Sequence, residues 1–221
     1  MHATLSHYRV VIFDWDGTLM DSAGQIVQAV QLAAADVGLL VPETASIRSG
    51  IGTSFDAQYQ RLFVLGSEQA DRARDDEVYM AFREAFYHRY DQSKPPLFAG
   101  VVPLLVRLKQ KGVVLAIATS GTRSMLNTML AGYALEGFFS HTYCGDEIAA
   151  KPAPDMLEAI VHDSQMEVGQ AVMVGDSVYD IQAANNAGMD SIGVSTGVSS
   201  RQALSAAGAL TVLDALDQLG G

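Results

Sequence analysis

Two carboxylates one residue apart follow an apolar run near the start of the chain. The run is Val10–Phe13, and the acids are Asp14 and Asp16. Residues i and i+2 of an extended chain point the same way, so both carboxylates would leave the strand on one side. Like charges this close repel unless a cation or a shared proton relieves them. The rest of the chain can be interpreted as supplying that cation and a grip on a substrate.

More polar side chains follow later apolar runs or lie in a stiff loop. Thr119 and Ser120 follow one such run. Asp176 follows another, and Asp180 comes one helical turn later. Lys151 lies in a loop that two prolines stiffen. If these segments meet, they bring four carboxylates, a pair of hydroxyls and one ammonium to a single edge.

Phosphoryl transfer is the chemistry that needs this set of groups. A carboxylate nucleophile that attacks a phosphate lies close to other anions, and a hard cation such as Mg²⁺ with oxygen ligands offsets the repulsion. The phosphoryl oxygens need donors, which a lysine, hydroxyls and backbone N–H groups provide. A second carboxylate beside the nucleophile can serve the leaving group as general acid.

The elements that must position these groups alternate between strand and helix. Buried strands are expected at 10–13, 113–118, 142–144, 171–174, 191–194 and 209–212, and helices at 101–111, 122–130, 155–162, 179–187 and 200–207, with one more at the end of the chain. Such alternation predicts a doubly wound α/β domain with a parallel sheet. Ligands bind at the carboxyl ends of the strands in such sheets, where the polar side chains stand.

A helical insert interrupts this alternation. Helical spacing of apolar residues predicts helices at 22–37, 42–49, 54–63 and 67–90. The break at Ser93-Lys94-Pro95-Pro96 is the expected linker back to the α/β part. We therefore expect a core domain at residues 1–19 and 97–221 and an all-helical domain at 20–96, which would close over the active edge.

Four segments, in chain order, resemble the motifs of the haloacid dehalogenase-like superfamily. They are Asp14-Trp15-Asp16-Gly17-Thr18-Leu19, the strand end at Thr119, Lys151-Pro152-Ala153-Pro154, and Gly175-Asp176-Ser177 with Asp180. The insert resembles the family's C1-type helical cap. The most similar branch is the phosphoglycolate-phosphatase and β-phosphoglucomutase-like group, and the resemblance covers nearly the whole chain.

The resemblance implies a role for each acid. Asp14 would be the nucleophile that forms an aspartyl-phosphate. Asp16 would be general acid and then general base, and its backbone carbonyl would be a metal ligand. Asp176 would bind Mg²⁺ directly, and Asp180 would lie behind it or act through water. An aspartate at position 16 favours phosphatase or phosphomutase chemistry within the superfamily.

The resemblance also implies a phosphate grip. Thr119 and the backbone around Ser120 would hold the phosphoryl oxygens, and Lys151 would pair with the nucleophile and the phosphoryl group. The chain departs from the family pattern at Ala150, where glycine is usual. In the cap, Arg48 is a candidate for contact with the substrate, and an ordinary solvated helix end explains it equally well.

The function expected from these residues is hydrolysis of a small phosphate monoester, with phosphoglycolate as the example from the family branch. A phosphomutase of the β-phosphoglucomutase type is the alternative, and a phosphate-binding protein without catalysis is a third hypothesis. Oligomeric state, monomer or homodimer, stays open.

Bulk composition narrows the partners and the compartment. The 221 residues carry a formal net charge of −11, which argues against nucleic acid or an anionic membrane as partner. The single cysteine excludes an internal disulfide and fits a reducing, cytoplasmic setting. No apolar run reaches the length of a membrane helix, and the first residues lack the apolar segment of a signal peptide.

Overall fold

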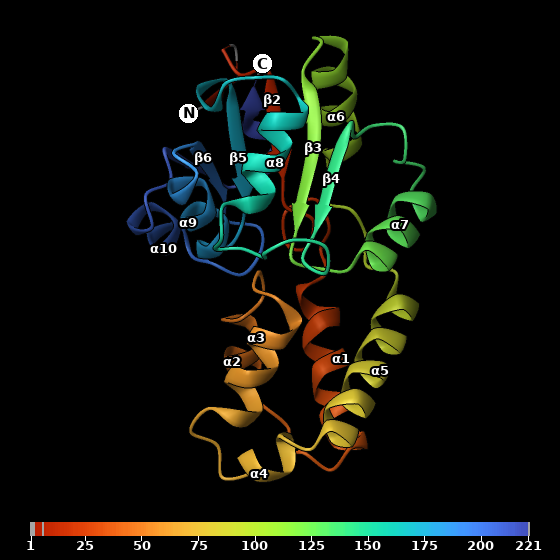
Figure 1. Ribbon diagram of the computed structural model, residues 1–221. Coiled ribbons are helices and arrows are strands. Elements are labelled where there is room, and N and C mark those ends of the chain that lie inside the picture. Colours follow the sequence, from red (N-terminus) through yellow and green to blue (C-terminus); the bar gives the residue numbers. More distant parts are fainter. Residues whose placement is uncertain (1–2, 6, 221) are drawn as a thin grey trace.

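The computed structural model describes residues 3–5 and 7–220, and it consists of an α/β part and a helical part (Figure 1). Strands β3 (Val114–Thr119) and β4 (His141–Cys144) run toward the helical part in Figure 1. The carboxyl ends of the parallel strands therefore face it. Among the described residues, no helix is both long enough and apolar enough to cross a membrane.

The sheet of the α/β part is parallel throughout. Within the described chain its strands lie in the order β4-β3-β2-β5-β6-β7. The remaining strands are β2 (Val10–Phe13), β5 (Ala171–Gly175), β6 (Asp190–Val194) and β7 (Thr211–Leu213). Strand β2 is central, with Phe13 level with Ile117 of β3 and Val174 of β5. The three segments that end in Asp14, Thr119 and Asp176 are thus direct neighbours.

Helices cover both faces of the sheet because its central strands are apolar on both sides. Val10 and Ile12 pack with residues of α8 (Asp155–Asp163) and α9 (Val178–Asn186). Val11 and Phe13 point the other way and share a core with α6 (Val101–Gln110). Helices α7 (Arg123–Gly132) and α10 (Arg201–Ala206) flank the two edges. This is the doubly wound arrangement that the alternation predicts.

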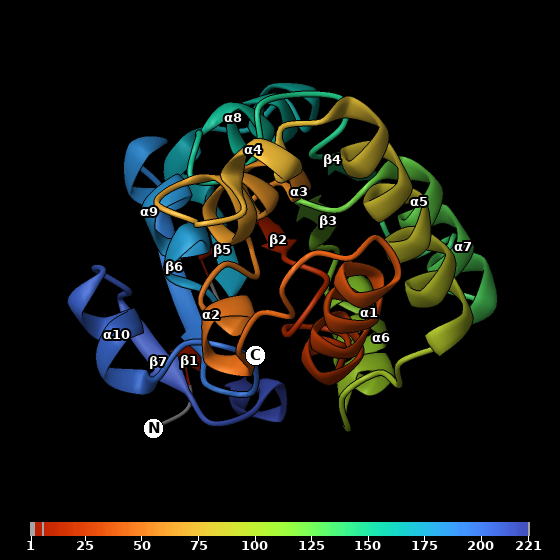
Figure 2. The ribbon, with the colours of Figure 1, turned by 90° about the horizontal axis from the view of Figure 1, so that it is seen from below.

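The helical part has an aromatic core of its own, which includes Tyr59, Phe63 and Phe82. Its helices are α1 (Ala23–Asp36), α2 (Thr44–Arg48), α3 (Phe55–Tyr59), α4 (Ala70–Ala73) and α5 (Asp76–Ser93). A π-helical turn, Gln60–Val64, continues α3. Figure 2, seen from this side, shows these helices grouped around the end of β2. We refer to the helical part as the cap.

Two expectations about elements are wrong. The single helix expected at 67–90 is divided into α4 and α5, because Asp75 accepts hydrogen bonds from the N–H groups of Glu77 and Val78 and so starts a new helix. The expected terminal helix is a 3₁₀ turn, Leu216–Gln218, followed by strand β8 (Leu219–Gly220), which pairs with β1 (Ala3–Thr4). So few residues cannot form a stable helix.

The two linkers between core and cap lie side by side. The N–H of Asp21 donates to the carbonyl of Pro96 at 2.8 Å, and the N–H of Phe98 donates to that of Leu19 at 3.0 Å. Between these bonds, Met20 forms a bridge with Leu97. The domain limits at 19/20 and 96/97 stay predictions, and the linkers meet at these positions.

Candidate active site

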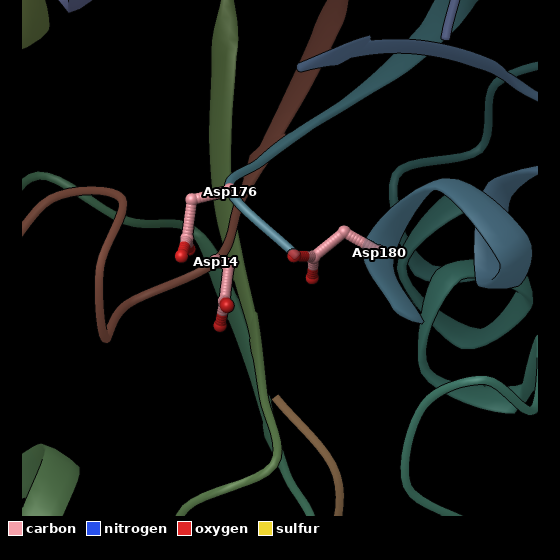
Figure 3. Close-up of side chains that lie close together, drawn as sticks. All are labelled: Asp14, Asp176 and Asp180. Carbon is pink, nitrogen blue, oxygen red and sulfur yellow. The ribbon is translucent and has the colours of Figure 1, made fainter. Parts of the chain in front are cut away.

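Three aspartates converge where the central strands end, as Figure 3 shows. Asp14 follows β2, Asp176 follows β5, and Asp180 lies in the first turn of α9. One carboxylate oxygen from each lies within 4.8 Å of the others, and all three side chains are buried. The right-handed crossovers of a parallel sheet place strand ends at one edge, which explains how residues 160 positions apart come together.

Lys151 lies among these carboxylates. Its Nζ atom is 2.7 Å from Oδ1 of Asp14 and 2.6 Å from Oδ1 of Asp180, and its side chain is 0% exposed. Both predicted partners of the sequence motif, the first aspartate and the lysine, are therefore in direct contact. The second contact, with Asp180, is one that the sequence did not suggest.

Asp176 is held from two sides. The hydroxyl of Thr18 donates to Oδ1 at 2.8 Å, and the N–H of Val198 donates to Oδ2 at 2.9 Å. The backbone approaches so closely that a Cβ on Gly197 would lie 1.9 Å from Oδ2. Gly17, at φ +80°, leaves equally little room on its side, with 2.4 Å to the same atom. Glycine at both positions permits this packing.

Asp180 uses both of its carboxylate oxygens. Oδ2 accepts from the N–H of Ser177 at 2.9 Å and from its hydroxyl at 2.7 Å, as a capping box at the start of α9. Oδ1 accepts from Lys151. Asp180 thus orients the lysine, and this agrees with a place behind the reacting groups.

Asp16 faces the space between core and cap. The phenol of Tyr90, in α5, donates a hydrogen bond to its Oδ1. Burial raises the pKa of the Asp16 carboxyl, and the hydrogen bond from Tyr90 partly opposes this. The sequence analysis missed Tyr90, although the spacing of Phe82 and Phe86 continues to position 90 and places it on the same buried face.

The loop after β3 completes the floor of a cavity between core and cap. The Thr119 hydroxyl accepts from the N–H of Gly121 at 3.1 Å. The Ser120 hydroxyl donates to the carbonyl of Gly52 in the cap at 2.7 Å. Asp14, Asp16 and these three loop residues all line the cavity. The predicted phosphate-binding segment therefore lies next to the aspartate pair.

Arg48 lies away from this cavity. Its guanidinium donates to the carbonyl of Gly197 at 2.9 Å and so joins the cap to the loop that packs on Asp176. Among the described residues, Arg48 is not one that lines the cavity. The geometry favours a contact between cap and core over contact with the substrate.

The buried carboxylates carry more negative charge than Lys151 can compensate. Burial raises the pKa of Asp14 well above its usual range, with Asp180 adding to the rise and Lys151 opposing it. Burial and the neighbouring Asp180 raise the pKa of Asp176 to about 7. Burial alone would lower the pKa of Lys151, but Asp14 and Asp180 raise it overall. A cluster of oxygen ligands with an uncompensated charge fits a hard divalent cation such as Mg²⁺.

The comparison with protein families decides what kind of protein carries this site. The family model of haloacid dehalogenase-like hydrolases matches residues 11–194. The chain belongs to this family. The resemblance inferred from the four motifs is confirmed, and the hydrolase has all four at the carboxyl edge of its sheet.

Relatives and solved structures support the same assignment. The hydrolase is 30% identical to phosphoglycolate phosphatase of Agrobacterium fabrum, over 85% of this chain and 81% of that one. It is also 30% identical to phosphoglycolate phosphatase of Pectobacterium atrosepticum, over 96% and 91%. The crystal structure of a hydrolase from Pseudomonas syringae superimposes with a TM-score of 0.83 at 25% identity, covering 95% of each chain. The predicted fold class is thus confirmed along nearly the whole chain.

Proposed function

We propose that this hydrolase is a Mg²⁺-dependent phosphatase that cleaves a small phosphate monoester through an aspartyl-phosphate. The observation that carries the proposal is the buried Asp14 carboxylate in contact with Lys151, beside Asp176, at the edge where ligands bind in such sheets. The names of the relatives make phosphoglycolate the reference substrate.

In the first step, a carboxylate oxygen of Asp14 attacks the phosphorus atom. The bond from phosphorus to the ester oxygen breaks, and Asp16 gives its proton to that oxygen as the alcohol leaves. The hydrogen bond from Tyr90 holds the Asp16 carboxyl in place. The raised pKa of Asp16 suits a group that must carry a proton before the reaction.

In the second step, Asp16 takes a proton from a water molecule that attacks the aspartyl-phosphate. The bond from phosphorus to Asp14 breaks, and inorganic phosphate and the free carboxylate are the products. Lys151 stays paired with Asp14 and neutralises charge on the phosphoryl oxygens, and Thr119 and the backbone around Ser120 donate to them.

The metal-binding residues would be Asp14, Asp176 and the backbone carbonyl of Asp16. Mg²⁺, when bound there, supplies positive charge that reduces repulsion between the substrate phosphate and the carboxylates. Asp180 has both oxygens engaged by Ser177 and Lys151, so its contribution is to orient the lysine.

The test is Asp14→Asn, assayed by phosphate release from p-nitrophenyl phosphate with Mg²⁺ present and chelated. Loss of the nucleophile should lower kcat by more than about 10³-fold. The matched control is Asp217→Asn, at an exposed position far from the cavity, which should retain activity. Retained turnover in Asp14→Asn would exclude the assigned nucleophile.

A further inference from the structure

The cap side of the active-site cavity is apolar and aromatic. Its lining residues from the cap are Ile26, Ile51, Gly52, Thr53, Phe55, Gln58, Phe86 and Tyr87. The rings form one cluster, since the centroid of Phe55 lies 5.3 Å from that of Phe86 and 5.2 Å from that of Tyr87. Met125, from α7 of the core, adds to this wall. The charged side chains that line the cavity are Asp14 and Asp16, among the residues described.

The arginines of the cap are engaged with other groups. Five of them bind backbone carbonyls or carboxylates away from the cavity: Arg48 with Gly197, Arg61 with Ser46, Arg72 with Val37, Arg74 with Asp71, and Arg89 with Asp36. Lys94 is exposed at the end of α5. These cations therefore give no positive charge to the cap wall.

Arg83 is the cap cation that comes near. Its guanidinium carbon lies 5.7 Å from the centroid of the Tyr87 ring. It lines the neighbouring grooves, together with Tyr87 and Asp146, and it does not line the cavity itself. An anion in the cavity would thus face ring and aliphatic carbon where Arg83 would have to reach it.

We infer that the substrate is a phosphate monoester whose leaving alcohol is uncharged and carries an apolar or aromatic face. This inference rests on the proposed phosphatase function. The charge of the phosphoryl group is met by Lys151 and by a bound cation. A second anion, such as the carboxylate of phosphoglycolate, would lie against apolar side chains and near Asp16, and an unpaired charge in such a place is costly. An aromatic or aliphatic group there gains contact with Phe55, Phe86 and Tyr87.

The experiment compares three esters: 2-phosphoglycolate, its neutral carboxamide 2-phosphoglycolamide, and benzyl phosphate. kcat/KM is measured with wild-type protein and Mg²⁺, and Kd is measured by calorimetry with Asp14→Asn protein and Mg²⁺. We expect both neutral esters to exceed phosphoglycolate by at least about tenfold in kcat/KM and in affinity, because a buried unpaired carboxylate costs more than that ratio requires. Equal or better performance of phosphoglycolate in either measurement overturns the inference.

Two variants sharpen the result. Gln58→Arg places a cation in the cavity wall and should shift the ratio toward phosphoglycolate by about tenfold relative to Gln58→Met. Arg83→Ala should leave the ratio unchanged, and selective loss of phosphoglycolate turnover in this variant overturns the inference. Because binding to Asp14→Asn protein needs no turnover, absence of hydrolysis with a preserved preference in affinity would refute the phosphatase function alone.

Discussion

At the scale of single residues, Gly197 determines how closely the backbone packs on Asp176. The carboxylate lies between Gly17 and Gly197 and accepts hydrogen bonds from Thr18 and Val198. A carboxylate fixed in this way keeps its oxygens aimed at the cluster with Asp14. Groups that orient a metal ligand affect metal affinity almost as strongly as the ligand itself.

Gly197→Ala should displace Asp176, because the new Cβ would lie 1.9 Å from Oδ2. We expect the Mg²⁺ concentration for half-maximal activity to rise by about 10- to 100-fold. A Mg²⁺ titration of phosphatase activity measures this. The control is Gly132→Ala, where a Cβ meets nothing within 4 Å. Equal Mg²⁺ requirements in the two variants would contradict the packing argument.

Lys151→Met should destabilise the folded protein, since Asp14 and Asp180 would lose their shared cation in a buried place. Removal of one partner from a buried ion pair costs about 3–5 kcal/mol. The free energy of unfolding, from urea titration with Mg²⁺ chelated, measures the effect. Lys111→Met, at an exposed lysine, is the control. A difference below about 1 kcal/mol between the variants would show that the pair does not stabilise the fold.

Much of the site is predictable at this scale, because strand ends of a parallel sheet converge. Asp14, Asp176 and Lys151 follow from that rule together with residue type. The contact of Lys151 with Asp180 is a different matter, since it depends on how the loop before α8 packs on α9. Arg48 was chosen for its charge and for the glycines beside it, yet its direction depends on tertiary contact with Gly197.

At the scale of elements, α5 joins the cap to the proposed acid. It begins at the cap of Asp75, presents Phe82 and Phe86 to the interior, and ends near Tyr90, whose phenol reaches Asp16. Phe86 and Tyr90 are stacked, with their planes 8° apart. A rotation of the cap would therefore move the group that holds Asp16.

Tyr90→Phe should impair esters that need a proton on the leaving oxygen. Loss of a hydrogen bond to a charged group of about 1.5–3 kcal/mol lowers kcat for benzyl phosphate by about tenfold or more. 2,4-Dinitrophenyl phosphate, whose leaving group departs without a proton, should change by less than about threefold.

The control for this helix is Tyr79→Phe, which removes a phenol that bonds to Asp56 instead. Steady-state kinetics with both esters measure the effect in each variant. Equal losses with both esters in Tyr90→Phe would indicate a general structural defect and contradict a role in positioning Asp16.

The elements themselves were mostly predictable, with exceptions that local competition explains. The strands at 10–13 and 171–174 follow from apolar runs with no competing pattern. The stretch 67–90 has helical spacing throughout, but Asp75 prefers to cap and divides it. The π-helical turn at Gln60–Val64 depends on how the cap packs, and spacing alone gives no sign of it.

At the scale of the whole molecule, the net charge of −11 and the buried aspartate cluster act in the same direction. Both make the metal-free protein electrostatically unfavourable. A divalent cation at the cluster relieves the local part of this repulsion, so Mg²⁺ should stabilise the folded state.

Addition of Mg²⁺ at about 100-fold over its Kd should stabilise the fold by about 2.7 kcal/mol. For a chain of this length, that corresponds to a rise in Tm of about 5–10 °C. Differential scanning calorimetry with Mg²⁺ or chelator measures the shift. Asp176→Asn should lose most of it, whereas the exposed Asp71→Asn should keep it. A full shift in Asp176→Asn would place the bound ion elsewhere.

The adjacent linkers have a consequence for how such proteins diversify. Leu19 and Phe98 are hydrogen-bonded neighbours, as are Asp21 and Pro96, so the core backbone is almost continuous across the insertion point. A recombination event that exchanged the intervening segment would leave every strand pairing of the six-stranded sheet in the described chain intact. Selection could thus replace the wall that meets the alcohol while keeping the carboxylates that carry out the chemistry, and the two could evolve at different rates.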